Sequence, residues 1–380
     1  MTDLNTDCRH FRSDRPCAPH KATGVVCATC EPAPAGAYDP VATRVLVVKL
    51  AAAGDVLRTT CFLPALHRRW PGAHVTWVTA PDALPLFAGN PLVDQVIPFR
   101  GGVPVELAAR RFDVILNPDA DPSACALAHA ARSETRLGFD LDERTGLARP
   151  LGPGAARWFE LGVRDDLKRA NRTSYQQLVA DVLQLDWRLE PPMLAVDEAA
   201  AERGRRLRAE HPPADGRLVI GLNTGAGRRW RFKRWTEDGM TELVRRLSAE
   251  GHRVFLLGGP DEIERNARLV HASGDQAVDT GTDNPLPVFA GIVDACDVVL
   301  TGDTLAMHVA IARGKRVVAL FGPTPPWEIE FFGRGEAVAS DVPCLVCYLP
   351  DCDVAPNCME SITPDMVQAA LTRQVEALRA

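Results

Sequence analysis

The sequence predicts an α/β protein with two Rossmann-like domains that face each other. A strand, a polar turn and a helix follow one another at residues 44–70 and again at 218–249, about half a chain apart. Strands and helices alternate along the rest of the chain. A length of 380 residues is enough for two domains that each bury a core. We therefore expect one Rossmann-like domain in each half.

The spacing of apolar residues places the other elements. In the N-terminal half it predicts strands at 75–79 and 113–117 and helices at 123–132 and 174–185. In the C-terminal half it predicts a strand at 253–257 and helices at 261–271 and 286–296. A Pro-rich, acidic stretch at 186–202 is typical of a linker. The chain then divides into a Cys-rich N-terminal extension (1–40), two Rossmann-like domains (41–190 and 191–340), and a Cys cluster with a closing helix (341–380).

Composition and charge narrow the class of protein. The net charge of −6 argues against nucleic acid as the main partner, although the basic residues at 228–234 could meet phosphates. No apolar run reaches the ~18 residues that a membrane-spanning helix needs. The first 30 residues are polar and Cys-rich, unlike a signal peptide. We expect a cytoplasmic protein.

The turn after residues 299–302 is the best candidate for an anion site. Thr304 is placed to cap the next helix, whose unpaired N–H groups and dipole favour a phosphate. His308 follows about one turn later, and residues 322–324 form a Gly-Pro-Thr lip over the same place. This pattern is typical of the donor site of a nucleotide-sugar enzyme.

Lysine is rare in this chain. Of 43 basic residues only five are lysines, and two of them, Lys49 and Lys233, lie at the mouths of the inferred cleft. A compact point charge cannot be replaced by a planar guanidinium where geometry is tight. A functional role for each competes with a plain surface lysine that escaped a bias towards arginine.

The chain resembles the glycosyltransferase family 9 heptosyltransferases over roughly residues 41–375. The motifs that carry the resemblance are Lys49 with Gly54-Asp55-Val56, Gly89-Asn90-Pro91, Arg136-Leu137-Gly138-Phe139, Thr224-Gly225-Ala226 with Lys233-Arg234-Trp235, Leu257-Gly258-Gly259-Pro260, Gly302-Asp303-Thr304 with His308, and Phe321-Gly322-Pro323-Thr324. Each motif alone is weak, but together they are specific.

This resemblance implies a GT-B glycosyltransferase that moves a heptose from ADP-heptose, with inversion, to a hydroxyl of lipopolysaccharide core or another surface glycan. The N-terminal domain would bind the glycan or lipid-linked glycan acceptor, and the C-terminal domain the donor. Asp55 would be the general base and Lys233 a catalytic cation at the diphosphate. No cofactor would be needed for catalysis, and peripheral contact with the inner membrane is compatible with such an acceptor. The implied donor-binding residues are Lys49, Thr224, Gly225, Glu262, Asp303, Thr304, Leu305 and His308.

Several of these residues have a second interpretation. Leu305 stands where the family usually has glycine, so we expect a shifted phosphate or a roomier opposite wall, with a different donor as the alternative. Asp55 could be a helix-capping carboxylate, and His308 a buried, hydrogen-bonded helix histidine. The Asp119-Ala120-Asp121 motif is expected to shape a turn and a helix start away from the donor half, without binding a metal.

Eight of the eleven cysteines gather near the two ends of the chain. The two sets are Cys8, Cys17, Cys27 and Cys30, and Cys344, Cys347, Cys352 and Cys358. The Cys-x2-Cys spacings predict a structural metal at each set, zinc before iron, with His10 and His20 as substitute ligands. Free thiols, or one site shared by both sets, are the alternatives. The C-terminal set also resembles a cluster found in many family members.

Other functions remain open at this point. A nucleotide-sugar epimerase of the same fold, or a heptosyltransferase that modifies proteins, would use similar residues. A nicotinamide-dependent oxidoreductase is disfavoured because no turn offers Gly-x-Gly-x-x-Gly. The acceptor is expected to contact loops after Asp55 and Thr79 and around Asp119. Arg58, Arg136 and Arg172 are candidate contacts to acidic sugars.

Overall fold

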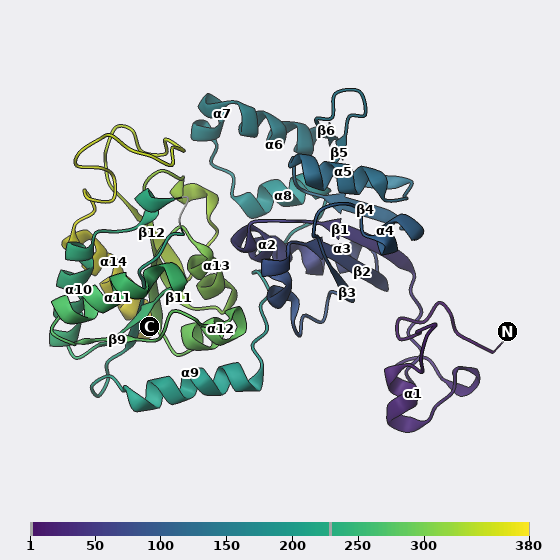
Figure 1. Cartoon of the computed structure of the whole chain (residues 1–380), viewed down its shortest axis with the longest axis horizontal. Coiled ribbons are helices and arrows are strands. Elements are labelled where there is room, and N and C mark those ends of the chain that lie inside the picture. The colour runs from purple at the N-terminus through teal and green to yellow at the C-terminus, as the bar shows by residue number, and fades with distance from the viewer. Residues whose placement is uncertain (1–2, 228–229, 380) are drawn as a thin grey trace.

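The computed structural model describes residues 3–227 and 230–379 and contains two α/β domains side by side (Figure 1). Arg228 and Arg229 of the basic cluster lie outside the described residues. The segment 184–197, which joins the two domains, contains no helix or strand. The predicted pair of Rossmann-like α/β domains is confirmed.

The N-terminal sheet has the order β3-β2-β1-β4-β5-β6, parallel except for β6, which runs antiparallel to β5. Residues 45–48 of β1 are all buried, as expected for a parallel strand covered on both faces. The strands are β1 (Thr43–Val48), β2 (Ala73–Thr79), β3 (Gln95–Pro98), β4 (Val114–Asn117), β5 (Thr135–Leu141) and β6 (Ala148–Leu151). The helices are α2 (Ala53–Thr59), α3 (Leu63–Arg69), α4 (Val105–Ala109), α5 (Pro122–Ala130), α6 (Pro153–Val163), α7 (Asp165–Ala170) and α8 (Tyr175–Leu183).

The C-terminal sheet is parallel throughout, in the order β12-β11-β10-β7-β8-β9. Its strands are β7 (Val219–Asn223), β8 (Arg253–Leu257), β9 (Ala277–Asp279), β10 (Val298–Gly302), β11 (Arg316–Phe321) and β12 (Gly335–Ala339). Its helices are α9 (Glu198–Glu210), α10 (Glu237–Ala249), α11 (Ile263–Ala272), α12 (Leu286–Asp294), α13 (Leu305–Ala312) and α14 (Pro364–Arg379). Short 3₁₀ turns include η4 (Arg231–Lys233), η5 (Pro260–Glu262) and η6 (Pro326–Glu328).

The strand orders place the functional edges. Each sheet has a topological switch point, where successive strands stop being added on one side and start being added on the other. It lies between β1 and β4 in the first sheet and between β7 and β10 in the second. Ligands of open α/β sheets bind outside the carboxyl ends of the strands at such a reversal. The loops that follow these four strands are therefore the places to look for a site.

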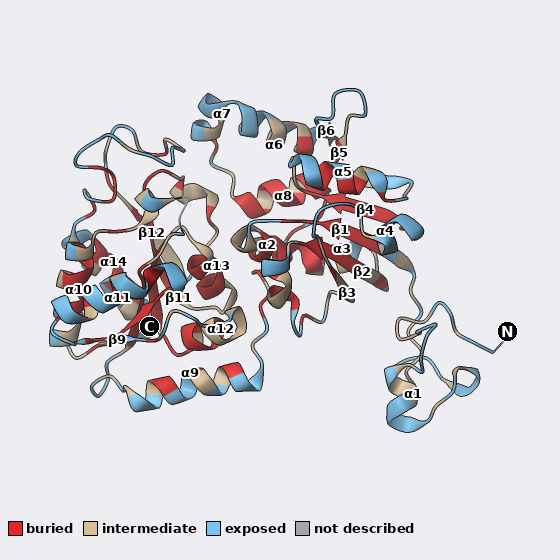
Figure 2. Ribbon diagram, in the orientation of Figure 1, coloured by how far each residue is buried: buried red, intermediate tan, exposed pale blue. Residues whose placement is uncertain are grey.

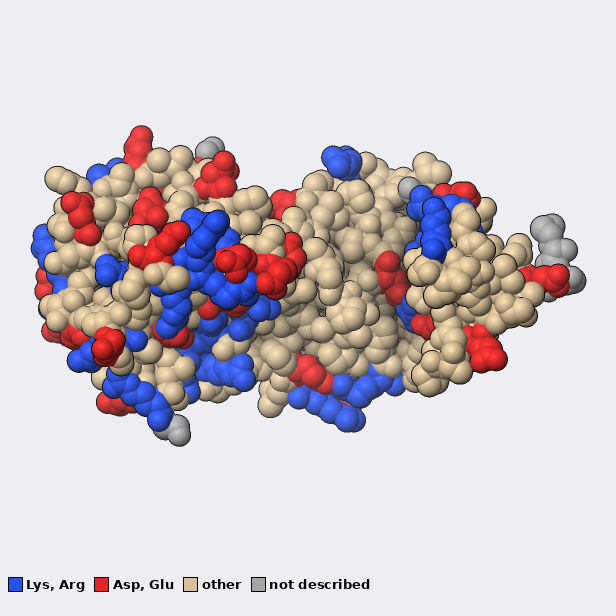
Figure 3. Space-filling view, turned by 90° about the horizontal axis from the view of Figure 1, so that it is seen from below, with Lys and Arg blue, Asp and Glu red and all other residues tan. Residues whose placement is uncertain are grey.

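Burial follows the sheets (Figure 2). The strands of both sheets are largely buried, whereas α1 (Ala18–Thr23) has no buried residue. Helix α9 packs on α12 through a close backbone contact, since a Cβ atom on Gly204 would lie 2.0 Å from the carbonyl oxygen of Gly291. The exposed face of α9 carries charges of both signs together, as the view from below shows (Figure 3). Arg205, for example, pairs with Glu198 and Glu202.

Two expected helices differ in detail. The helix expected to run to Trp70 is divided into α2, a 3₁₀ turn (Thr60–Phe62) and α3. Pro64 lies at the start of α3 and has no N–H to donate to the carbonyl of residue 60, so an unbroken α-helix cannot pass through it. The helix expected at 261–271 begins with the 3₁₀ turn η5, in which Pro260 occupies the first position, where its missing N–H costs no helical hydrogen bond.

The N-terminal extension forms a small lobe beside the first domain (Figure 1). Arg9 links it to the body through an ion pair with Asp94, which precedes β3, and forms a second ion pair with Asp39 inside the extension. Within the described residues, no helix has both the length and the apolar character required to cross a membrane.

Candidate functional site

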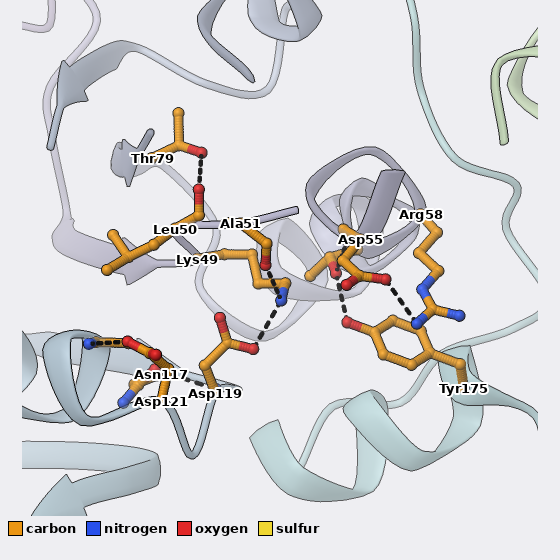
Figure 4. A network of polar contacts seen from close by, with 12 residues as sticks. Lys49, Leu50, Ala51, Asp55, Arg58, Thr79, Asn117, Asp119, Asp121 and Tyr175 are labelled. Carbon is orange, nitrogen blue, oxygen red and sulfur yellow. Dashed lines mark hydrogen bonds and ion pairs between the residues drawn. The ribbon is translucent and has the colours of Figure 1, made fainter. Parts of the chain in front are cut away.

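The first pair of candidate residues follows two neighbouring strands of the N-terminal sheet. Lys49 follows β1 and Asp119 follows β4. Lys49 is 3% exposed, and its Nζ donates to Asp119 Oδ1 over 2.7 Å and to the Ala51 carbonyl over 3.0 Å (Figure 4). Burial disfavours its charge, but Tyr175, Asp119 and Asp55 raise the pKa of Lys49, so the amine stays protonated.

The Asp119-Ala120-Asp121 motif has two separate roles. Asp121 caps α5, as predicted, by accepting hydrogen bonds from the N–H groups of Ser123 and Ala124 at 2.9 and 3.1 Å. Asp119 lies in the turn before α5, where its N–H donates to Asn117 Oδ1 at 3.1 Å, and it also has a partner that was not predicted. Because β4 lies beside β1, its carboxyl end brings Asp119 to the buried amine of Lys49.

Asp55 lies in the first turn of α2. Its carboxylate accepts from the N–H of Ala52, so the helix-start interpretation is partly correct, and it forms an ion pair of 2.7 Å with Arg58 one turn later. The Arg58 guanidinium lies 3.3 Å from the centre of the Tyr175 ring. Burial alone would raise the pKa of Asp55, but Arg58 and Lys49 outweigh it and lower the pKa to about 2. Asp55 is therefore fully ionised at neutral pH and, while paired, weakly basic.

The facing half of the site is organised by Asp303. This residue follows β10, and its Oδ2 accepts from Lys233 Nζ at 2.6 Å and from the Thr324 hydroxyl at 2.8 Å. Thr324 of the Gly-Pro-Thr lip and Lys233, the expected catalytic lysine, thus donate hydrogen bonds to the same carboxylate. Burial disfavours the charge of Asp303, but Lys233 and His308 lower the pKa of the carboxyl below its ordinary value.

Thr304 stands at the N-cap of α13 but does not cap it. We expected its side chain to accept from the helix; instead Thr304 Oγ1 lies 3.1 Å from Thr301 Oγ1 and 3.3 Å from Asn223 Nδ2. Asn223 at the end of β7 competes for the hydroxyl. The first turn of α13 is therefore without a side-chain cap, which leaves its N–H groups available to an anion.

Thr224, Gly225 and Glu262 form a tightly packed corner. Thr224 is fully buried, and its hydroxyl donates to Asn266 Oδ1 at 2.6 Å, so the hydroxyl supports the loop; its contact with a donor stays a prediction. A Cβ atom on Gly225 would lie 2.5 Å from Glu262 Cδ. Glu262 Oε2 accepts from the Gly259 N–H at 3.0 Å, while its buried Oε1 has no hydrogen-bond partner among the described residues.

His308 and Leu305 of α13 meet the N-terminal domain at Gly54. A Cβ atom on Gly54 would lie 2.9 Å from His308 Cδ2 and 3.6 Å from Leu305 Cα. Burial, reinforced by Arg58, lowers the pKa of His308 to about 4, so the ring is neutral at pH 7. His308 is 5% exposed, yet no described residue hydrogen-bonds its ring. It is buried, but it is not the satisfied core histidine of the alternative interpretation. The side chain of Leu305 packs against the apolar core.

The three candidate arginines lie in different places. Arg58 is inside the site, and Arg172 lies 4.0 Å from the ring centre of Trp327. Arg136 donates to the carbonyls of Ser133 and Ala131 at the start of β5. That edge is opposite the strand ends that carry Lys49, so Arg136 lies apart from the residues gathered around Lys49.

The cysteines form no disulfide, and all eleven lie in the described residues. Within residues 3–227 and 230–379 no group of three or more His, Cys, Asp or Glu side chains is arranged to hold a metal ion. The thiols of the C-terminal set act on one another electrostatically. Burial raises the pKa of the Cys358 thiol to about 11, with contributions from the neighbouring Cys347, Cys352 and Cys344.

The positions of Tyr175 and Asn223 in the site were not predicted from the sequence. The strand order could have indicated Asp119, because acids after adjacent parallel strands meet at one edge. Tyr175 comes from a helix whose apolar pattern gives no sign of the phenol's position.

Polar and charged side chains at the reversal point of each sheet come together where the two α/β domains meet, and two such domains facing each other form the GT-B architecture. We call this set the interdomain site; its members are Lys49, Asp55, Arg58 and Asp119 on one side and Lys233, Asp303 and His308 on the other. The model of glycosyltransferase family 9 (heptosyltransferase) matches residues 105–348, more than half of the chain. The chain belongs to this family and is a glycosyltransferase.

Known relatives agree with this assignment. The chain is 27% identical over 337 residues to a lipopolysaccharide heptosyltransferase 1 of Pseudomonas aeruginosa, covering 83% of this chain and 88% of the relative. Its fold is similar to a family 9 glycosyl transferase from Veillonella parvula, with a TM-score of 0.67, 19% identity and coverage of 88% and 98% of the two chains. It is also similar to an Escherichia coli heptosyltransferase with ADP-2-deoxy-2-fluoro heptose, with a TM-score of 0.58, 19% identity and coverage of 87% and 99%.

Proposed function

We propose that this protein transfers a heptose from ADP-heptose, with inversion, to a hydroxyl group of lipopolysaccharide core or a related surface glycan. The observation that carries the proposal is the contact between α2 and α13. Gly54, the neighbour of Asp55 in α2, lies against Leu305 and His308 at the start of α13, directly after the uncapped Thr304. A base and an anion site facing each other suit displacement of a nucleotide diphosphate by a hydroxyl.

The reaction assigns a task to each side. Asp55 takes the proton of the acceptor hydroxyl as the acceptor oxygen forms a bond to the anomeric carbon from the face opposite the leaving group. The bond from that carbon to the phosphate oxygen breaks, and ADP departs with the electron pair. Charge then develops on the diphosphate, where Lys233 and the N–H groups of α13 stabilise it. A single displacement from the face opposite the leaving group inverts the configuration of the anomeric carbon.

The donor nucleoside is assigned to the corner between Gly225 and Glu262. Glu262 Oε1 is a buried acceptor without a partner in the described residues, and ribose hydroxyls are donors of the right kind. A side chain at position 225 would collide with the Glu262 carboxylate. Glycine at this position therefore lets the loop lie close to Glu262. Contact of Lys49, Leu305 and His308 with the donor, and peripheral contact with the inner membrane, stay predictions.

The cysteine sets are proposed to hold structural zinc or iron, because clustered thiols are the donors that these ions prefer. The support is the Cys-x2-Cys spacing of each set and the mutual electrostatic influence of the thiols around Cys358. Among the described residues these side chains are not arranged as a ligand sphere, and the proposed role of the ion is structural.

The test is product analysis. Purified enzyme is incubated with ADP-heptose and a heptose-free core acceptor, and the products are identified by mass spectrometry and by the anomeric configuration. Stoichiometric ADP release with a heptosylated, inverted product is expected. An isomer of the nucleotide sugar formed without ADP release would point to the epimerase instead, and transfer only to protein hydroxyls would replace the glycan acceptor.

A further inference from the structure

The turn from β1 to α2 presents the proposed base, but its own side chains are too small to anchor it. Residues 51–54 are three alanines and a glycine, and Ala51 and Ala52 are exposed. Ala52 is the N-cap of α2 and offers no side-chain cap. Small residues suit this place because Gly54 packs closely on His308 of the other domain. An anchor for the turn therefore has to come from outside it.

Lys49 supplies such an anchor. Its Nζ donates to the Ala51 carbonyl over 3.0 Å, directly before the N-cap of α2 and four residues before Asp55 (Figure 4). The same Nζ donates to Asp119 Oδ1 over 2.7 Å, and the side chain of Lys49 is almost completely buried. An ammonium group has three N–H donors. Two of the three are thus bound within the protein.

Asp119 is the fixed end of this contact. Its N–H donates to Asn117 Oδ1 at 3.1 Å, and its carbonyl accepts from the Cys125 thiol at 3.4 Å. Asn117 is fully buried at the end of β4, and its side chain donates to the Phe139 carbonyl on β5 over 3.0 Å. The central strands of the N-terminal sheet therefore set the position of the Asp119 carboxylate.

The charge of Asp119 keeps the ammonium group in this place. A buried ammonium ion without a counter-ion is strongly disfavoured, so it loses its proton or moves towards water. An opposite charge at 2.7 Å offsets that cost. Without the charge of Asp119, Lys49 would leave this position or become neutral. The Ala51 carbonyl would then lack its charged donor.

We propose that Asp119 is a positioning residue for the proposed base: it holds the Lys49 ammonium group against the Ala51 carbonyl and so fixes the turn that presents Asp55. This inference rests on the proposed function. It assigns Lys49 to the turn, in place of the contact with the donor that the family resemblance implies. No contact with a substrate is assigned to Asp119, which acts through Lys49.

Hydrogen exchange of backbone amides, followed by mass spectrometry, tests the anchor without any substrate. In Asp119→Asn and in Lys49→Met, residues 50–57 should exchange about tenfold faster than in the wild type, because the turn and the first turn of α2 open more often. Exchange in β2 and β5 should be unchanged. The matched control is Asp121→Asn, which alters the other acid of the motif and the cap of α5. In this control, residues 50–57 should exchange at the wild-type rate.

Steady-state kinetics tests what the anchor does for the reaction. In Asp119→Asn and in Lys49→Met, kcat should fall by about tenfold or more, because a base that is no longer held in place meets the acceptor hydroxyl less often. The KM for the donor and the affinity for ADP, measured by calorimetry, should stay within about twofold. Asp119→Glu keeps the charge and should recover part of kcat.

A double variant keeps the test independent of folding. Lys49→Met combined with Asp119→Leu leaves no unpaired buried charge, so its melting temperature should lie within a few degrees of the wild type. Its kcat should nevertheless stay low and residues 50–57 should exchange fast, because the Ala51 carbonyl still lacks its donor. A contact that served stability alone would restore both in this variant.

Several results would overturn this inference alone. They are unchanged exchange of residues 50–57 in both single variants, wild-type kcat in the double variant, and weaker ADP binding at normal kcat in Lys49→Met. A raised acceptor KM at unchanged kcat in Asp119→Asn would also do so, since it would make Asp119 a substrate contact. Absence of heptosyl transfer by the wild type would instead overturn the proposed function, whereas the exchange of residues 50–57 would still decide whether Asp119 anchors the turn.

Discussion

His308 of α13 packs against Gly54 of α2, and a Cβ atom on Gly54 would come within 2.9 Å of His308 Cδ2. The two residues belong to different domains, so a single missing side chain sets how closely the domains approach. The contact lies next to Asp55 and Thr304, which are the proposed base and the start of the proposed anion site.

Replacing Gly54 with alanine should impair catalysis more than stability. Alanine favours a helix over glycine by about 1 kcal/mol, so α2 itself should not be weakened. The added methyl group would push against a buried, rigid ring and hold the domains apart. We expect at least a tenfold loss of kcat, which kinetics would measure, with the melting temperature within a few degrees of the wild type. Gly162→Ala, which meets nothing within 4 Å, is the matched control.

Mutation can distinguish the catalytic role proposed for Asp55 from the helix-capping role of Asp121. Asp55→Asn should lower turnover by roughly a hundredfold or more, as expected for loss of a general base, and leave ADP affinity unchanged by calorimetry. Asp121→Asn should keep turnover and cost at most about 1 kcal/mol of stability through a weaker cap on α5. Near wild-type turnover of Asp55→Asn would exclude this residue from the mechanism.

Protonation of His308 should make the protein less stable in mild acid. The pKa of His308 is lowered to about 4 in the folded protein, against 6.5 for the unperturbed group. Between these values the unfolded chain binds the proton and the folded one does not, so stability is lost as pH falls through 6.5 towards 4. From pH 7 to pH 5 this group should cost about 2 kcal/mol. Melting curves at both pH values should show a smaller loss for His308→Gln; an equal loss would contradict the prediction.

The sequence was sufficient for the fold because local signals and topology agree. Fully apolar strands such as 45–48, followed by small polar turns, leave few alternatives to parallel sheets with helices between them. The positions of Asp55, Lys233 and Asp303 followed from the same turns. Pairings across the chain were not predictable in this way. Lys49 with Asp119, and Arg58 with Tyr175, depend on strand order and on the packing of α8, neither of which has a local signal.

The prediction for Thr304 failed for a related reason. A threonine before a helix is a good cap only when nothing else competes for its hydroxyl. Here Asn223 and Thr301 lie on the neighbouring strands β7 and β10 and take it. Thr224 is similar, since its partner Asn266 comes from α11, more than forty residues away. Side-chain hydrogen bonds between distant elements decided both cases.

The proposed metals should differ in their effect at the two ends of the chain. The C-terminal set is attached to the interdomain site, because the Val346 N–H donates to the Gly322 carbonyl over 2.9 Å and Cys358 packs against Gly322. The N-terminal set lies in the small lobe held by Arg9. Loss of an ion from the first should therefore disturb the lip around Asp303, and loss from the second should not.

Elemental analysis of the purified protein should find up to two equivalents of zinc or iron, and chelation should lower the melting temperature because metal-binding energy is also folding energy. Replacing both Cys347 and Cys352 with serine should lower the metal content by one equivalent and raise the KM for ADP-heptose. Replacing both Cys27 and Cys30 with serine should remove the other equivalent of metal and leave the transfer kinetics at low temperature unchanged. Protein without stoichiometric metal, with all eight thiols titratable in the native state, would contradict both sites. Turnover abolished by chelation at an unchanged melting temperature would mean that the ion acts in catalysis.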